Sequence, residues 1–345
     1  ILSSHAVTQM FEPLFKADVE GKLEPWLAES MKASPDRKTF TVTIRKGVKF
    51  SDGKPMTSAD VVFSLETVRK SPVWGIMFEL VESVKATGPD TVVIKTSKPA
   101  AKLEGQLSLP FAAIVPKNFG GESEEEFAAN PIGTGPFAYA SWKRGESLTF
   151  EKNKYYWKPG LPLLDKLVFE MVPDVNSRDS QLRANELDVI ASPDWSQLPS
   201  MEADSSLHVG IYKASILDSL GLNMKQPLFQ NEKIREAINL AIDREGIVKA
   251  ALFEHGETAG SWLMPGLEFH DAAIKAPAQD VAKAKELVAE AVQEGAEPTF
   301  QVSLLKGQTF TTTVAQIIQS NLAEAGFTVS LRPLDESAMN SVLPA

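Results

Sequence analysis

The sequence has no cysteine among its 345 residues, and it has only four histidines. Without cysteine, disulfide bridges, thiolate metal sites and cysteine nucleophiles are all excluded. The histidines stand at positions 5, 208, 255 and 270, and no two of them have the i, i+4 spacing of a helical zinc site. We therefore expect no metal centre and no cofactor.

Clusters of basic residues and long apolar runs are also missing. The chain has 35 Lys and Arg against 45 Asp and Glu, a net charge of -10, and its basic residues are dispersed. Because nucleic-acid binding requires clustered Lys and Arg, we expect no nucleic-acid partner. No apolar run approaches the ~20 residues that a membrane-spanning helix needs. The longest runs, such as residues 111–115, have only the length of a strand.

Two short motifs have an enzymatic interpretation, but the context of each favours a turn. Residues 133–138 match G-x-G-x-x-A, and the dinucleotide fingerprint requires a helix to follow. Here Pro136 and the alternation of Phe137 and Tyr139 predict a strand instead. Residues 51–54 fit S-x-x-K, but the S-D-N and K-T-G partners of that enzyme class are missing. The sequence thus predicts a protein that is not an enzyme.

Hydrophobic periodicity predicts a strand-rich first part of the chain. In residues 38–50, Phe40, Val42 and Ile44 alternate on one face of a strand. Thr57 and Asp60 are spaced as in a capping box and predict a helix start. Further strands are expected over residues 91–95, 107–116, 137–142, 148–150, 167–171 and 187–190.

The last third of the chain has an α/β pattern. Apolar residues at positions 234, 237, 238, 241 and 242 predict an amphipathic helix. Residues 281–293 and 314–325 predict two more helices, with strands at 300–305 and 327–331. The order strand, helix, strand at the end implies a parallel pair of strands.

Several blocks of sequence resemble the family 5 extracellular solute-binding proteins, which include dipeptide, oligopeptide, glutathione and nickel carriers. Residues 38–66, KTFTVTIRKGVKFSDGKPMTSADVVFSLE, closely resemble the signature strand, turn and helix of that family. Residues 130–142, 151–174 and 182–190 resemble its next blocks, and residues 229–253 resemble the block that enters the second lobe. The resemblance continues through AKAKELVAEA and VAQIIQSNLAEAGFTVSLRPLD, and it covers essentially the whole chain in the expected order.

The resemblance implies an α/β fold of the two-lobed periplasmic-binding-protein type (type II), with an extra subdomain in the first lobe. We place the first lobe at residues 1–222, the extra subdomain at 31–140 and the beginning of the second lobe at 223–345. Family members have a secretion signal and a strand upstream of what is Ile1 here, and they continue beyond Ala345. We therefore expect a fragment whose second lobe is truncated and whose missing tail holds several ligand-gripping residues.

The function implied is that of the extracytoplasmic subunit of an ABC importer. Such a subunit encloses a small molecule between its lobes and delivers it to a membrane permease. We expect the ligand to be a short peptide or a peptide-like compound such as glutathione. We expect a monomer, located in the periplasm or anchored outside a Gram-positive cell. A metal-chelate carrier of the nickel type and a secreted hydrolase remain as alternatives, although no nucleophile–base pair supports the hydrolase.

Segments that match cleft-lining parts of the family supply the candidate ligand-binding residues. Ser3, Ser4 and His5, which we place before the first helix, would hydrogen-bond the ligand, and Phe111 would form an apolar wall. Asn223 would bind peptide backbone through its amide, and Trp262 and Met264 would contribute from the second lobe. Asp194 would pair with a ligand ammonium, and Trp195 would stack on the ligand. A helix cap at Asp194 and core packing of the aromatic residues explain the same residues without a ligand. The full set is Ser3, Ser4, His5, Phe111, Asp194, Trp195, Asn223, Trp262 and Met264.

Overall fold

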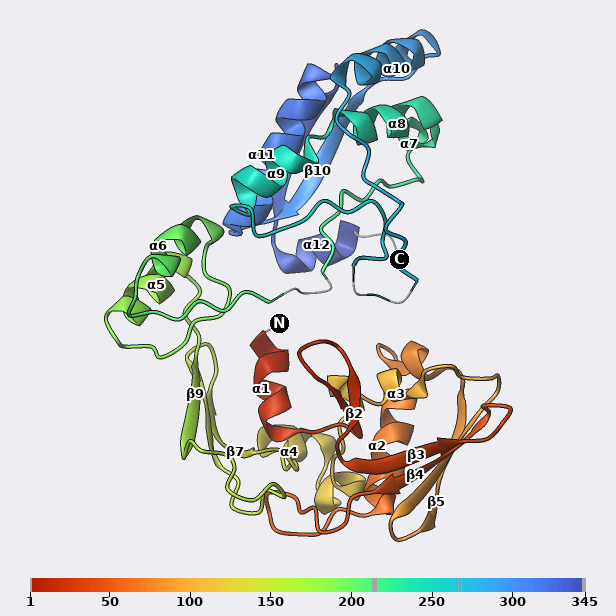
Figure 1. Cartoon of the computed structure of the whole chain (residues 1–345), viewed down its shortest axis with the longest axis vertical. Coiled ribbons are helices and arrows are strands. Elements are labelled where there is room, and N and C mark those ends of the chain that lie inside the picture. The colour runs from red at the N-terminus through yellow and green to blue at the C-terminus, as the bar shows by residue number, and fades with distance from the viewer. Residues whose placement is uncertain (1, 213–215, 266, 268, 343–345) are drawn as a thin grey trace. The chain divides into compact units, whose positions relative to one another are not determined.

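The computed structural model describes residues 2–212, 216–265, 267 and 269–342. The chain divides into two compact units, a first unit of residues 1–172 and a second unit of residues 173–345. In Figure 1 the first unit runs from red to yellow-green and the second from green to blue. The lobe boundary after residue 222 and the subdomain at residues 31–140 stay predictions.

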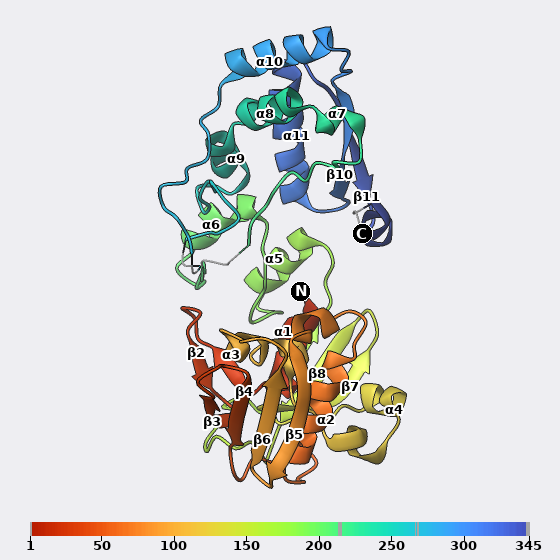
Figure 2. The ribbon, with the colours of Figure 1, turned by 90° about the vertical axis from the view of Figure 1, so that its right-hand side faces the viewer.

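The largest sheet of the first unit is antiparallel, with strand order β3-β4-β6-β5 (Figure 2). On β4, Phe40, Val42 and Ile44 are almost completely buried, and the threonines between them are half-buried. Helix α2 packs on β5 and β6, so this alternation places the apolar face of the sheet against the helix. The elements are β3 (Ala28–Ala33), β4 (Thr39–Ile44), α2 (Ser58–Arg69), β5 (Val81–Gly88) and β6 (Thr91–Thr96).

The predicted capping box at the start of α2 is confirmed. The backbone N–H and the hydroxyl of Thr57 both donate to the Asp60 carboxylate at 2.7 Å. The other oxygen of Asp60 accepts the backbone N–H of Lys117 at 2.7 Å. Because Asp60 is buried, this one carboxylate fixes both the helix start and a distant loop.

A second antiparallel sheet, β7-β8-β9, forms a separate small core of the first unit with helix α1. Ala6 and Met10 of α1 are buried against Phe137 and Phe150 of the sheet. The bounds are α1 (Leu2–Met10), β7 (Phe137–Lys143), β8 (Ser147–Lys152) and β9 (Lys166–Glu170). The remaining elements of this unit are β1 (Phe15–Ala17), β2 (Leu23–Pro25), η1 (Gly75–Phe78), α3 (Leu103–Gln106), η2 (Pro110–Ala112), η3 (Lys117–Gly121) and α4 (Glu124–Ala129).

The glycine motif at residues 133–138 is a structural turn, as predicted. The N–H of Gly135 donates to the carbonyl of Met10 at 2.7 Å. A Cβ atom at Gly133 would lie 2.1 Å from that same carbonyl oxygen, so a side chain cannot fit there. Strand β7 follows the motif, and the glycines thus allow close packing of the chain against the end of α1.

The second unit is built around the predicted parallel pair of strands, β10 and β11, joined by helix α11. The amphipathic helix is confirmed as α8, which buries Ile234, Ala237, Ile238 and Ala241 in a core shared with α10 and α11. The bounds are α5 (Val175–Arg183), η4 (Trp195–Gln197), α6 (Leu198–Glu202), α7 (Pro227–Gln230), α8 (Glu232–Ala241), α9 (Arg244–Ala251), α10 (Val281–Gln293), β10 (Thr299–Leu305), α11 (Thr309–Glu324), β11 (Thr328–Leu334) and α12 (Glu336–Val342).

Two of the predicted strands are wrong. Residues 107–116 contain the short 3₁₀ helix η2, because Pro110 fixes φ near the helical value at its first position. Residues 187–190 pair with no strand among the described residues, and Val189 in their middle is 82% exposed. Both segments are apolar, but neither pairs with a strand among the described residues. No ladder of backbone hydrogen bonds therefore holds them extended.

Candidate functional site

The first unit presents a pair of stacked aromatic rings at its surface. Trp74 and Phe111 lie 4.3 Å apart between ring centroids, with an interplanar angle of 10°. Trp74 follows α2 in a tight turn in which the N–H of Gly75 donates to Ser71 O at 2.9 Å. A Cβ atom at Gly75 would lie 2.7 Å from the carbonyl oxygen of Arg69, so the turn requires glycine. The turn therefore positions the indole against Phe111.

This stack is open to solvent and lies beside other apolar side chains. Trp74 is 46% exposed, and its neighbours in sequence Val73, Ile76 and Met77 are also exposed. A run of exposed apolar residues on a folded unit marks a binding surface more often than single exposed residues do. The flat, half-open indole suits stacking on a planar group of a ligand.

Helix α1 contributes the other predicted residues of the first unit. The 3₁₀ helix η2 that carries Phe111 packs against α1, so the structure brings Phe111 and this helix together. Ser3, Ser4 and His5 lie within α1 and not before it, because the helix already begins at Leu2. His5 is exposed. The side chains of Ser3 and Ser4 lie outside the described part of the structure.

In the second unit, Asp194 is the N-cap of η4. Its Oδ1 accepts the backbone N–H of Ser196 at 2.9 Å and the Ser196 hydroxyl at 2.7 Å. Partial burial acts to raise the pKa of Asp194, but the hydrogen bonds from Ser196 and Thr309 outweigh it, and the net shift is downward. Asp194 is thus both a helix cap and a stable negative charge.

Trp195 is held by a histidine that is distant in sequence. Its indole stacks on the imidazole of His255, with ring centroids 6.2 Å apart and an interplanar angle of 27°. His255 Nε2 lies 3.8 Å from Glu202 Oε1. Trp195 is half-buried, so this contact restrains one face of the ring while part of the ring stays accessible.

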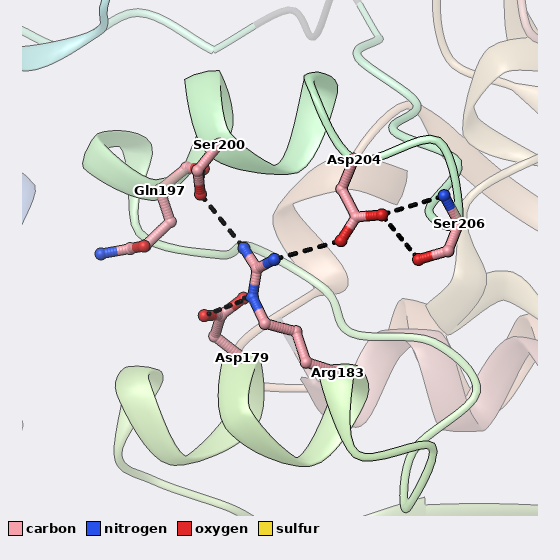
Figure 3. Close-up of polar contacts among 6 residues, drawn as sticks. All are labelled: Asp179, Arg183, Gln197, Ser200, Asp204 and Ser206. Carbon is pink, nitrogen blue, oxygen red and sulfur yellow. Dashed lines mark hydrogen bonds and ion pairs between the residues drawn. The ribbon is translucent and has the colours of Figure 1, made fainter.

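Arg183 connects the helices on either side of η4 (Figure 3). Its Nε lies 3.1 Å from Asp179 on α5, and its two terminal nitrogens reach Ser200 on α6 at 3.1 Å and Asp204 at 3.3 Å. Asp204 is oriented in turn by the backbone N–H and hydroxyl of Ser206. The arginine of the LRANELDVI block therefore fixes the segment that carries Asp194 and Trp195.

We expect Arg183→Gln to loosen this segment without unfolding the second unit. Exposed ion pairs contribute about 0.2–1 kcal/mol each, so losing two should cost about 1 kcal/mol. Hydrogen exchange of amides 194–204 should accelerate, while exchange in α8 stays unchanged. Arg332→Gln, at an exposed arginine on β11, is the control. Equal exchange rates for residues 194–204 in both variants would contradict the role given to Arg183.

The remaining predicted residues are Asn223, Trp262 and Met264. None of the described contacts joins them to Asp194. Asn223 Oδ1 accepts the N–H of Lys225 at 3.0 Å in a local turn. Trp262 is 74% exposed, and Met264 is half-buried and accepts the N–H of Leu267 through its carbonyl. Their ligand-binding roles stay predictions.

No group of three or more His, Asp or Glu side chains among the described residues is arranged to hold a metal ion. No helix in the described ranges combines the length and the apolar character needed to cross a bilayer.

A comparison with known protein families identifies the family of this chain. The model of "Bacterial extracellular solute-binding proteins, family 5 Middle" matches residues 22–343. The chain belongs to this family. Its fold is accordingly the α/β periplasmic-binding-protein fold that the sequence resemblance implied.

Individual relatives agree with this assignment. The chain is similar to the glutathione-binding protein GsiB of Escherichia coli K12, with 28% identity over 340 residues. The alignment covers 97% of this chain and 65% of that relative, so the chain spans about two thirds of the relative's length.

Solved family 5 structures superimpose closely. NikA from Brucella suis in complex with Fe(III)-EDTA matches with a TM-score of 0.85 and 27% identity, over 98% of this chain and 72% of that one. AppA from Bacillus subtilis in complex with a nonapeptide matches with a TM-score of 0.82 and 28% identity, over 99% and 72%.

Trp74 is the candidate that the sequence prediction missed. It stands in an apolar run directly after Pro72. Four large apolar residues within five positions after a proline are the signal that would have indicated it.

Proposed function

We propose that this chain belongs to the solute-binding subunit of an ABC importer that carries short peptides or peptide-like molecules to a membrane permease. The observation that carries the proposal is the open Trp74–Phe111 stack in a family 5 chain. The subunit works outside the cytoplasm, in the periplasm or at the surface of a Gram-positive cell. It acts as a monomer and has no nucleic-acid partner.

A peptide fits the chemistry of the candidate residues. The aromatic stack offers a flat apolar wall for a side chain or a peptide plane, and Asp194 offers a negative charge for an ammonium group. The names of relatives that bind glutathione or a nonapeptide support the same ligand class. The matching family is one of solute-binding proteins, so bound peptide should leave intact.

A metal chelate is the second candidate ligand. The structural match to NikA in complex with Fe(III)-EDTA, with its TM-score of 0.85, favours it. A chelated metal brings its own donor atoms, so the protein then needs walls and charges more than a cluster of ligating side chains. His5, an exposed residue of α1, is the imidazole donor that this helix offers.

Trp74→Ala should weaken solute binding about 10-fold, because truncating a stacked aromatic side chain removes about 1–2 kcal/mol of contact energy. Calorimetric titration with dipeptides, tripeptides, glutathione and a nickel–histidine chelate measures this loss.

The matched control is Trp142→Ala, since Trp142 is an equally exposed tryptophan of the same unit, at 48% against 46%. The proposal fails if wild-type protein binds no member of the panel. The role of Trp74 fails if the two variants bind alike.

A further inference from the structure

A buried carboxylate organises two tryptophans in the first unit, away from the Trp74–Phe111 stack in sequence. Glu12 is only 3% exposed. Its Oε1 accepts the indole N–H of Trp26 at 2.7 Å and the hydroxyl of Tyr156 at 3.0 Å, and its Oε2 accepts the indole N–H of Trp157 at 3.0 Å. The two indoles therefore stand edge to face, with centroids 5.5 Å apart.

Three basic side chains gather on this pair of indoles. Lys158 Nζ lies 3.4 Å and Lys16 Nζ 4.5 Å from the centroid of Trp26. The Arg45 guanidinium lies 4.7 Å from the centroid of Trp157. Within the described ranges, none of the three cations is within ion-pair distance of a carboxylate. Arg45 Nε also donates to the Trp26 carbonyl at 3.0 Å, so the partners of these cations are indole rings and a backbone carbonyl.

A depression of about 400 Å³ opens on the hairpin of β1 and β2, and Lys16 is the one of the three cations that lines it. Trp26 and Lys16 line it, together with Ala17, Asp18, Val19 and Glu24. Trp26 is half-buried, so one part of its ring belongs to the core and another part faces this depression.

The nearby carboxylates differ in how many hydrogen bonds they already accept. Glu12 is saturated by neutral donors. Asp18 Oδ1 accepts the backbone N–H groups of Glu20 and Lys22, at 2.9 Å each. Glu24 is exposed on β2 and is the remaining negative group of the lining.

The cations repel one another in the absence of a further anion. Desolvation lowers the pKa of Lys158, the charges of Lys16 and Arg45 lower it further, and Glu12 and Glu24 only partly oppose them. Like charges held together at a protein surface create a positive potential that attracts anions.

We propose that Lys16 and Lys158, whose ammonium groups both lie within 4.5 Å of the Trp26 ring centroid, bind an anionic group, a carboxylate or a phosphate, at the edge of this depression. The two ammonium groups donate charge-assisted hydrogen bonds to the anion. The Trp26 ring, which Glu12 fixes through its indole N–H, holds the two ammonium groups next to the anion. Its residues are not among those proposed for the solute site, and the proposal does not depend on that site.

The test uses the indole N–H resonances of the six tryptophans in ¹⁵N-labelled protein at low ionic strength. Inorganic phosphate or citrate should shift the resonances of Trp26 and Trp157 saturably, and leave that of Trp142 unchanged. Lys16→Gln and Lys158→Gln should each weaken this binding about 3- to 5-fold. Glu24→Gln should strengthen it by a similar factor, because it removes a repelling charge. Lys85→Gln, at an exposed lysine on β5, is the control.

Vesicles distinguish the two sources of the anion. If the shifts require phosphatidylglycerol in phosphatidylcholine vesicles, the anion is a lipid headgroup, and if soluble anions suffice, it is a small acid. Absence of saturable shifts with every probe overturns the proposal. So does binding that is unchanged in both lysine variants, and so does weaker binding in Glu24→Gln, which would indicate a ligand whose ammonium pairs with Glu24.

Discussion

Asp194→Asn should weaken the binding of a short peptide by about 30-fold or more. A ligand ammonium that the bound protein encloses and that loses its carboxylate partner costs about 2–5 kcal/mol, and each 1.4 kcal/mol is about tenfold in affinity. Asn is as good an N-cap as Asp, so the hydrogen bonds to Ser196 and the fold of η4 should survive the change. Calorimetric titration of both proteins with the same peptides gives the ratio.

The control is Asp174→Asn. Asp174 is the N-cap of α5 and accepts the N–H and hydroxyl of Ser177, just as Asp194 does from Ser196. It thus reproduces the same chemical change at a cap outside the candidate residues. If Asp194→Asn binds peptide as tightly as Asp174→Asn does, Asp194 is a helix cap and nothing more.

Glu12→Ala should lower the free energy of unfolding of the first unit by about 3 kcal/mol or more. The change leaves the two indole N–H groups and the Tyr156 hydroxyl without their acceptor, at about 1–3 kcal/mol for each buried donor. Relief of the cost of burying a carboxylate offsets part of this loss. Urea unfolding followed by tryptophan fluorescence measures the change.

Glu82→Ala, at an exposed glutamate on β5, should change stability by less than about 0.5 kcal/mol and serves as the control. A loss below about 1 kcal/mol in Glu12→Ala would show that the indoles do not depend on this carboxylate.

The pH dependence of stability tests the same group. Burial raises the pKa of Glu12 above its usual value, although the hydrogen bonds from Trp157, Trp26 and Tyr156 act in the opposite direction. The folded protein therefore binds a proton that the unfolded chain releases, and Glu12 destabilises the fold as pH rises through the raised pKa. The stability advantage of wild type over Glu12→Gln should shrink over that pH range.

The parts of the fold that were predictable from the sequence are those encoded by patterns within short stretches of residues. The alternation of Phe40, Val42 and Ile44 fixed the buried face of β4, and the spacing of Thr57 and Asp60 indicated the start of α2. The strand–helix–strand order predicted the parallel pair β10 and β11. Each of these signals lies within a short stretch of chain.

The features that the sequence did not predict depend on contacts between residues that are far apart in the chain. Glu12 meets Tyr156 and Trp157 only after folding, across more than 140 residues. Apolar content at residues 107–116 suggested a strand, but the backbone at Pro110 and the absence of a described partner strand decided otherwise. Asp194 and Trp195 were found through family resemblance, and the restraints from Arg183 and His255 were visible only in three dimensions.

Native mass spectrometry of the freshly purified protein, incubated with a mixture of di- and tripeptides, glutathione and a nickel–histidine chelate, tests the central claim most directly. The account predicts one intact peptide or glutathione bound per chain and no cleavage products in solution. A bound species with the isotope pattern of nickel would favour the chelate carrier instead. A protein that binds none of these solutes, or that steadily converts the peptides into smaller products, would contradict the assignment as a solute-binding subunit.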